Sequence, residues 1–226
     1  MNFIRMHSIK HLIFLLLCLV PISLPAQTMS LDEFFVDGIS SQIQIGKELR
    51  SSLISQYKSG NGGELTMRNG NVVRILEYKE NDYMTLQTSE KGFFSLKRWV
   101  RGNRTIFGLS WWVSTPVRDG HVKFVDLSTL DNVVKFPVVG VKDFLSDDSL
   151  SAQQTTADEF CQQLEAQFLH CEFTESDTIW VYDDTREFLD LLRRRTYGRF
   201  WKGNALPVLF GKDDFIKGEA VFRKKQ

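Results

Sequence analysis

The chain has 226 residues, in which 28 lysines and arginines balance 28 aspartates and glutamates. It is 42% hydrophobic and 25% charged, a composition that provides for a buried core and excludes disordered, collagen-like and disulfide-dominated proteins. Because the charge balance leaves no basic stripe for a sugar-phosphate backbone, we expect no nucleic-acid partner.

The N-terminus has the pattern of a secretory signal peptide. Arg5 and Lys10 give a positive start, an unbroken apolar run covers 12–20, and a short segment then leads to the small residue Ala26. The run has nine residues, whereas a membrane-spanning helix needs about 20. We therefore expect cleavage near Ala26 and export to the periplasm or the outer surface, with an uncleaved anchor as the alternative. No transmembrane segment is expected after the signal is removed.

Residues 28–60 have helical patterns. Ser30 and Glu33 have the spacing of a capping box, in which a hydroxyl and a carboxylate each satisfy a backbone amide at the start of a helix. Gly38 is expected to end this short helix. A second helix is predicted over 47–58.

Residues 63–141 change to the period of β-strands. Turn signals such as Asn69-Gly70 and Asp119-Gly120 recur mostly every 10 to 12 residues, with short apolar and β-branched runs between them. This spacing predicts a meander of antiparallel strands near 64–68, 72–79, 83–88, 93–100, 105–113, 121–127 and 133–139. Alternation within the runs predicts core side chains at Met84, Leu86, Phe94, Leu96, Phe107, Leu109 and Trp111.

Helical spacing returns after a polar linker over 146–156. Thr156 and Glu159 repeat the capping-box spacing, and apolar residues at steps of four from Phe160 to Phe168 predict a helix with one buried face. The later elements are a hairpin, a helix and two strands, predicted near 171–174, 178–182, 184–198, 199–201 and 206–210.

The predicted elements form an α+β fold with a signal peptide over 1–26. Residues 27–145 combine short N-terminal helices with the antiparallel β-meander. Residues 146–226 form a smaller α-β-β-α-β unit.

Three segments give the chain a resemblance to a known family. They are the signal ending Leu-Pro-Ala-Gln, the Asn-Asp-Tyr-Met-Thr-Leu segment at 81–86, and the helix and strand over 184–201 that end in Trp-Lys-Gly. In these segments the chain resembles an uncharacterised family of secreted proteins, a domain of unknown function, from Bacteroidales-type bacteria. The resemblance implies export and the α+β architecture, and it carries no catalytic residue to this chain.

No pattern predicts a catalytic site. The Gly-x-Ser segment at 108–110 lacks the second glycine of a nucleophile elbow and lies inside a predicted strand. Adjacent acids such as Asp183-Asp184 do not by themselves supply the two carboxylates across a cleft that glycoside hydrolysis requires. We therefore predict a protein that is not an enzyme, with a carboxylate-dependent hydrolase as the weakest alternative.

Cys161, His170 and Cys171 lie within eleven residues, but without a fourth ligand they do not match a zinc spacing. No metal and no cofactor are predicted. A disulfide between Cys161 and Cys171 is one reading in an oxidising compartment, and two buried thiols are the other. A bridge requires the helix to end near Leu169 and reverse, because a continuous helix would separate the cysteines by about 15 Å.

Three consecutive arginines, Arg193, Arg194 and Arg195, fall in the last turn of a predicted helix. Cations at that end complement the helix dipole, so we interpret them as a solvated helix end. A phosphate site is the alternative.

Aromatic residues are predicted on both faces of the meander. If Phe107 and Trp111 face the core, alternation places Trp112 on the opposite face, where Phe93 and Trp99 of the neighbouring strand join it. Either helices or the C-terminal unit cover this second face, or it is an exposed platform that stacks on sugar rings or anchors a partner protein.

These observations predict a non-enzymatic exported binding or assembly module of the bacterial cell envelope. Its partner is expected to be a glycan or a cell-envelope protein. Glycan binding through Phe93, Trp99 and Trp112 is the specific alternative.

Overall fold

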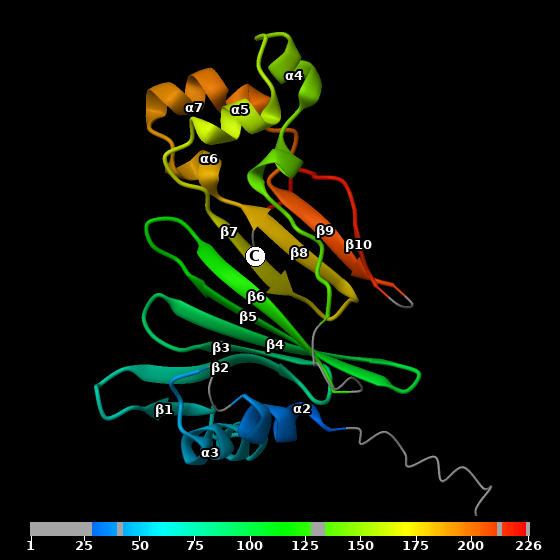
Figure 1. The fold of residues 1–226 in the computed structure, drawn as a ribbon. Helices are drawn as coiled ribbons and strands as arrows, with labels where there is room; N and C mark the ends of the chain where they lie inside the picture. The colour runs from blue at the N-terminus through cyan, green and yellow to red at the C-terminus, as the bar shows by residue number, and fades with distance from the viewer. Residues whose placement is uncertain (1–28, 40–42, 128–133, 212–213, 225–226) are drawn as a thin grey trace, which may run out of the picture.

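The structure, a computed structural model, describes residues 29–39, 43–127, 134–211 and 214–224. The predicted signal peptide lies outside the described residues. The fold is α+β, as predicted, with two antiparallel sheets between N-terminal helices at one end and a group of short helices at the other (Figure 1). None of the helices in the described part of the chain has the length and apolar character that crossing a bilayer requires.

The predicted N-terminal helices are confirmed. The helical elements are α2 (Leu31–Glu33), η1 (Phe34–Gly38) and α3 (Lys47–Lys58). The capping box also forms, because the Glu33 carboxylate accepts the Ser30 backbone N–H at 2.8 Å and the Ser30 hydroxyl accepts the Glu33 N–H at 3.1 Å.

The first sheet is the predicted meander, with its six strands in chain order. They are β1 (Glu64–Thr66), β2 (Val72–Lys79), β3 (Tyr83–Gln87), β4 (Gly92–Arg101), β5 (Arg104–Val113) and β6 (Asp119–Asp126). The predicted seventh strand, 133–139, is wrong, because its described residues 134–139 have no regular structure. Pro137 has no backbone N–H to donate to a ladder, which explains the loss.

The C-terminal part forms the second sheet, with strand order β10-β9-β8-β7, and the short helices beside it. The strands are β7 (Leu169–Phe173), β8 (Thr178–Asp183), β9 (Ala205–Phe210) and β10 (Phe215–Lys217). The helices are η2 (Val141–Phe144), α4 (Asp147–Ser151), α5 (Ala157–Gln162), α6 (Thr185–Phe188), α7 (Leu191–Tyr197) and η3 (Gly198–Phe200). The predicted hairpin is thereby confirmed as β7 and β8.

Local hydrogen bonds change several predicted C-terminal elements. The linker predicted over 146–156 contains α4, which the Ser146 hydroxyl caps. The helix predicted over 184–198 is divided into α6 and α7, because the Asp190 carboxylate accepts a backbone N–H and starts a new helix. The strand predicted over 199–201 is instead mostly η3, and α5 ends before Phe168 of the predicted stripe.

The first sheet packs one face on the N-terminal helices. The rings of Phe34 and Phe107 stack with centroids 3.8 Å apart, and Phe35 packs on Phe94. The predicted core residues Met84, Leu86, Phe94, Leu96, Phe107 and Leu109 are buried on this face, and Trp111 is half-buried beside them. Alternation therefore identified the correct face of the sheet.

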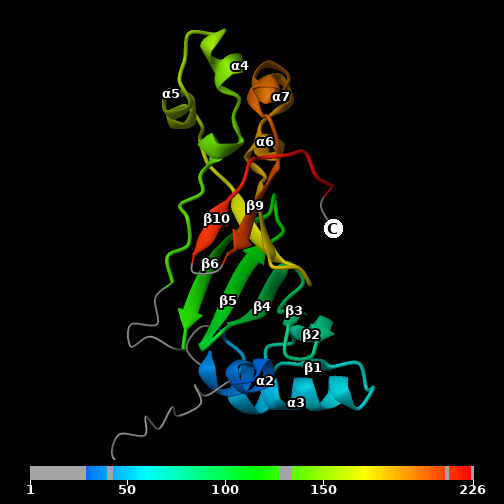
Figure 2. The same ribbon diagram turned by 90° about the vertical axis from the view of Figure 1, so that its right-hand side faces the viewer.

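The opposite face of the first sheet packs on the second sheet, where both sheets contribute aromatic rings. This inter-sheet core includes Trp99 and Phe124 from the first sheet and Phe173, Phe210 and Phe215 from the second. Figure 2 shows β9 and β10 next to the end of the first sheet where β6 lies, and β7 of the second sheet contacts β4, β5 and β6. The first sheet is therefore covered on both faces where the second sheet packs on it.

Close backbone contacts hold the two sheets together. A Cβ added at Gly108 would lie 2.7 Å from the Trp99 ring and 2.9 Å from the Phe173 ring, so only glycine leaves room there. Two residues on, the Ser110 hydroxyl donates to the Cys171 carbonyl at 2.7 Å. The Gly-x-Ser segment therefore packs the sheets together and has no geometry of a nucleophile.

Candidate functional site

A pocket of about 280 Å³ opens where the second sheet stops covering the first, and we call it the inter-sheet pocket. β7 is the edge strand of the second sheet, and it contacts β6, β5 and β4. The pocket lies beside that edge. Its lining residues are Leu76, Glu77, Thr85, Phe93, Ser95, Trp112, Ser114, Arg118, Glu172 and Phe173.

Two of the three predicted binding residues meet in this pocket. Phe93 and Trp112 are cross-strand partners on β4 and β5, and their rings stack with centroids 5.5 Å apart and planes 11° from parallel. Trp112 is 9% exposed and Phe93 is half-buried. The pair therefore forms an aromatic wall whose accessible part faces the pocket.

The third predicted binding residue, Trp99, lies elsewhere, and the prediction that it is part of an exposed platform is wrong. Trp99 is 2% exposed. Its ring packs on Phe173, Phe210 and Phe215 at centroid distances of 5.6, 5.9 and 6.1 Å. The second sheet needs apolar partners for these phenylalanines, and Trp99 supplies one. The alternative of a covered face is therefore correct at this end of β4.

A carboxylate from each sheet faces the inter-sheet pocket. Glu172 on β7 pairs with the Arg118 guanidinium at 2.5 Å. Glu77 on β2 accepts the Tyr83 hydroxyl at 3.0 Å. Burial, with a smaller effect from the Glu77 hydrogen bond, raises the pKa of Tyr83 to about 12, so this tyrosine stays a hydrogen-bond donor. Both carboxylates are therefore held in place by a donor from the protein.

Behind the aromatic wall lies a buried histidine. The His170 ring stacks on Tyr182 at 5.1 Å and lies 6.4 Å from the Trp112 ring, between centroids. Its Nε2 is 3.3 Å from the Glu172 carboxylate, and its Nδ1 is 3.8 Å from the Asp184 carboxylate. His170 thus lies between Glu172, which lines the pocket, and Asp184, which precedes α6.

The polar groups of the pocket suit a hydroxyl-rich ligand. Thr85 and Ser95 share a hydrogen bond of 2.9 Å on neighbouring strands, and both line the pocket. Hydroxyls can donate and accept, and carboxylates accept. The arrangement therefore combines an apolar ring surface with several directional hydrogen-bonding groups.

Sequence reasoning missed the charged residues of this pocket. Arg118 precedes β6 and Glu172 lies on β7, so they are 54 positions apart and share no sequence spacing. The sequence also does not predict that His170 lies behind the aromatic wall. In the described part of the chain, no group of three or more His, Cys, Asp or Glu side chains is placed to hold a metal ion.

The two cysteines of the predicted disulfide are free thiols in the structure. Cys171 lies on β7 in the inter-sheet core, and Cys161 is half-buried in α5. Burial raises the pKa of both thiols, that of Cys171 to about 12. Both cysteines are therefore poor nucleophiles at neutral pH.

Comparison with known proteins identifies a likeness in structure. No protein-family model and no curated protein matches the chain. A solved domain of an uncharacterized protein from Porphyromonas gingivalis W83 is similar, with a TM-score of 0.63 and 19% sequence identity over 83% of this chain and 97% of that one. At this identity, the likeness shows a shared fold alone.

Proposed function

We propose that this protein is a non-enzymatic binding module whose ligand site is the inter-sheet pocket. One observation carries the proposal: Phe93 and Trp112 stack at the wall of a pocket that also presents carboxylates and hydroxyls. Pockets with an apolar wall and a few placed polar groups are typical of small-ligand sites.

The ligand class that best fits this lining is a saccharide. Aromatic rings bind the apolar faces of sugar rings, and carboxylate and hydroxyl groups bind sugar hydroxyls. The volume of about 280 Å³ is just below the usual range for ligand pockets, so we propose that the pocket takes a short segment or the end of a glycan.

Affinity for oligosaccharides tests this proposal. We expect the mature protein to bind at least one member of a panel of maltotriose, cellotriose and N-acetylglucosamine trimers, measured by calorimetry. Phe93→Ala should weaken binding by about fivefold or more, because removal of an aromatic stacking partner costs roughly 1 to 3 kcal/mol. Phe93 is the better target than Trp112, since its half-buried ring costs less stability when removed.

Trp180→Ala is the matched control. Trp180 is a half-buried aromatic residue of β8 that stacks under Arg223 and does not line the pocket. The Trp180→Ala variant should bind the oligosaccharides with the affinity of the wild type. Equal binding by the wild type and Phe93→Ala, with both variants folded by circular dichroism, would contradict a ligand site at the aromatic wall.

A carboxylate-dependent hydrolase is the second candidate function, because Glu77 and Glu172 line the same pocket from different sheets. Two carboxyl groups across a cleft are what glycoside hydrolysis requires. Release of reducing ends in the same oligosaccharide incubations, lost in both Glu77→Gln and Glu172→Gln, would favour this function over binding alone.

Export to the cell envelope is the second part of the proposal. It rests on the N-terminal signal pattern. The similar domain from P. gingivalis also comes from a Bacteroidales bacterium, as does the secreted family that the sequence resembles. We expect the intact mass of protein purified from its native cells to lack about the first 26 residues. A mass that matches the uncleaved chain would contradict export with cleavage.

A further inference from the structure

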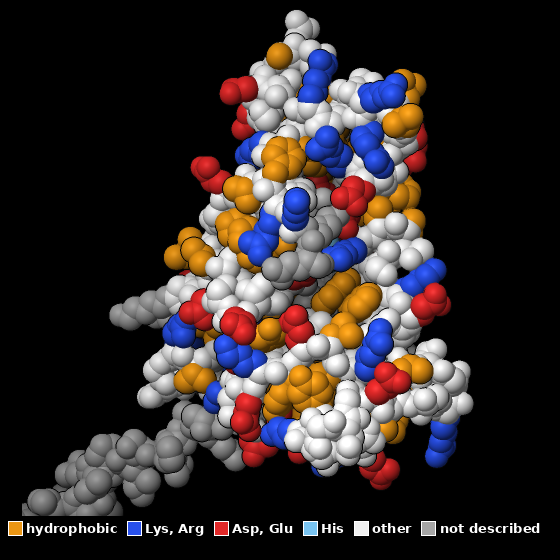
Figure 3. Space-filling view, turned by 180° about the vertical axis from the view of Figure 1, so that it is seen from behind, with side chains coloured by type: hydrophobic (Ala, Val, Ile, Leu, Met, Phe, Trp, Pro, Cys, Tyr) orange, Lys and Arg blue, Asp and Glu red, His pale blue; other side chains and the backbone are white. Residues whose placement is uncertain are grey.

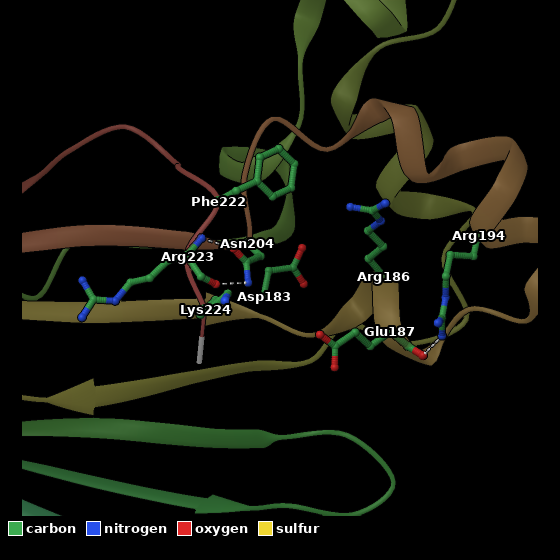
Figure 4. Close-up of a pocket in the computed structure, with 8 residues that line it drawn as sticks. All are labelled: Asp183, Arg186, Glu187, Arg194, Asn204, Phe222, Arg223 and Lys224. Carbon is green, nitrogen blue, oxygen red and sulfur yellow. Dashed lines mark hydrogen bonds between the residues drawn. The ribbon is translucent and has the colours of Figure 1, made fainter. Parts of the chain in front are cut away.

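A second and larger pocket, of about 450 Å³, lies at the far end of the second sheet, between α6, α7 and the C-terminal segment (Figure 4). We call it the arginine pocket. Its lining residues are Asp183, Arg186, Glu187, Arg194, Asn204, Phe222, Arg223 and Lys224.

Arg186 occupies the middle of this pocket. In Figure 4 its guanidinium points into the hollow between Phe222 and Arg194. The flat group lies against Gly198, where an added Cβ would come within 3.2 Å of its Nε. No residue in the described part of the chain forms a hydrogen bond or an ion pair with this guanidinium. Its donors are therefore available to a ligand.

Two neighbouring charged side chains, Asp183 and Arg194, form hydrogen bonds with other groups. The Asp183 carboxylate accepts the Trp201 indole N–H at 2.5 Å and the Thr185 backbone N–H at 2.9 Å. Burial raises the pKa of Asp183, which weakens it further as a counter-ion. Arg194 donates to the Glu187 and Leu189 carbonyls at the end of α6. The site thus presents Arg186, which has no hydrogen-bonded acceptor among the described residues, beside the fixed Arg194, with the Glu187 carboxylate as a further group of the lining.

The chain around the pocket is basic, although the whole chain has no net charge. From Thr185 to Phe200, which spans α6 to η3, there are five arginines and two acids, a net charge of +3. Figure 3 shows lysine and arginine side chains gathered on the upper half of the rear face, over these helices and the C-terminal segment. Such a surface attracts anions.

Large apolar side chains beside this basic surface are exposed to solvent. Leu191 and Leu192 at the start of α7 are 67% and 75% exposed, and Phe188 and Phe222 are also exposed. Apolar side chains next to arginines are the pattern of a protein surface that lies on an anionic membrane, with the apolar groups at the headgroup level.

We propose that this end of the molecule binds the surface of a membrane containing anionic phospholipid. The phosphate of one headgroup binds Arg186 in the arginine pocket, and Phe188, Leu191, Leu192 and Phe222 enter the interface around it. Arginine suits this role because its planar fork donates two parallel hydrogen bonds to phosphate oxygens. The inference is independent of the saccharide proposal, because the two pockets share no lining residue.

Vesicle flotation tests the proposal. The protein should float with phosphatidylglycerol-containing vesicles and stay in solution with pure phosphatidylcholine vesicles. Arg186→Gln should weaken binding about fivefold, the usual effect of one arginine at an anionic surface. The double variant Leu191→Ser, Leu192→Ser should also weaken it, since both side chains are already exposed and their replacement leaves the core intact.

Arg68→Gln is the charge-matched control. Arg68 is an exposed residue next to β1, at the opposite end of the molecule, and its replacement should leave flotation unchanged (Figure 1). Phe93→Ala should also float as the wild type does. Flotation of Arg186→Gln equal to that of the wild type would overturn the headgroup site. Absence of flotation would overturn the membrane proposal. Complete loss of flotation in millimolar inorganic phosphate at constant ionic strength would also overturn it, and would indicate a site for soluble anions.

Discussion

Trp99→Ala should lower the free energy of unfolding by about 3 to 5 kcal/mol, the usual cost of removing a large buried aromatic side chain. The ring packs on four phenylalanines, Phe124 on its own sheet and Phe173, Phe210 and Phe215 on the other. Its removal leaves a cavity that Gly108, which has no side chain, does not fill. Urea unfolding followed by circular dichroism measures the change.

The same variant separates a structural tryptophan from a binding one. Trp99→Phe keeps an aromatic ring in the inter-sheet core, and should recover most of the stability that Trp99→Ala loses. Neither variant should change oligosaccharide affinity while folded, because Trp99 does not line the inter-sheet pocket. A loss below about 1 kcal/mol for Trp99→Ala would mean that the two sheets do not depend on this contact.

The second large effect is expected at Lys97, a lysine that is only 2% exposed. Its ammonium contacts the Asp82 carboxylate at 2.5 Å and donates to the carbonyls of Thr174 and Glu175 at 2.8 and 3.1 Å. Lys97→Ala leaves the two carbonyls without this donor and leaves Asp82 with the long ion pair to Lys79. We expect a loss of about 3 to 5 kcal/mol, as for other broken buried ion pairs.

The two carbonyls that Lys97 binds lie in the turn between β7 and β8, so the lysine connects the first sheet to the second. Amide hydrogen exchange should therefore become faster over 169–183 than over β5 in Lys97→Ala. Lys79→Ala is the control, since that lysine is exposed and its ion pairs with Asp82 and Glu175 are long, at 3.8 and 3.4 Å. It should cost less than about 1 kcal/mol. Equal losses for the two variants would contradict a special role for Lys97.

The features that the sequence predicted correctly are those that local chemistry determines. The Ser30 and Thr156 capping boxes each depend on a residue three positions away, and both form. β2 has the predicted bounds because turn residues flank an alternating run. Pro137 shows the opposite case: apolar spacing around it suggested a strand, but a missing backbone donor prevents the ladder.

The candidate site was predictable only in part. Phe93 and Trp112 could be paired from strand alternation and register alone, because they are neighbours on adjacent strands. Trp99 lies on the same face of β4 as Phe93, and their different environments depend on where the second sheet crosses. That crossing, like the approach of Arg118 to Glu172, is set by packing between distant segments and has no local signal.

An NMR titration of the tryptophan indole N–H groups with the same oligosaccharides tests the central claim, a saccharide site in the inter-sheet pocket, most directly. Each of the five tryptophans gives one indole signal, and replacement of each tryptophan by phenylalanine assigns it. We expect the Trp112 signal to shift with saturation while the Trp99 signal, in the inter-sheet core, stays in place. Shifts at Trp180 without Trp112, or no shift with any of the sugars, would contradict the proposed site.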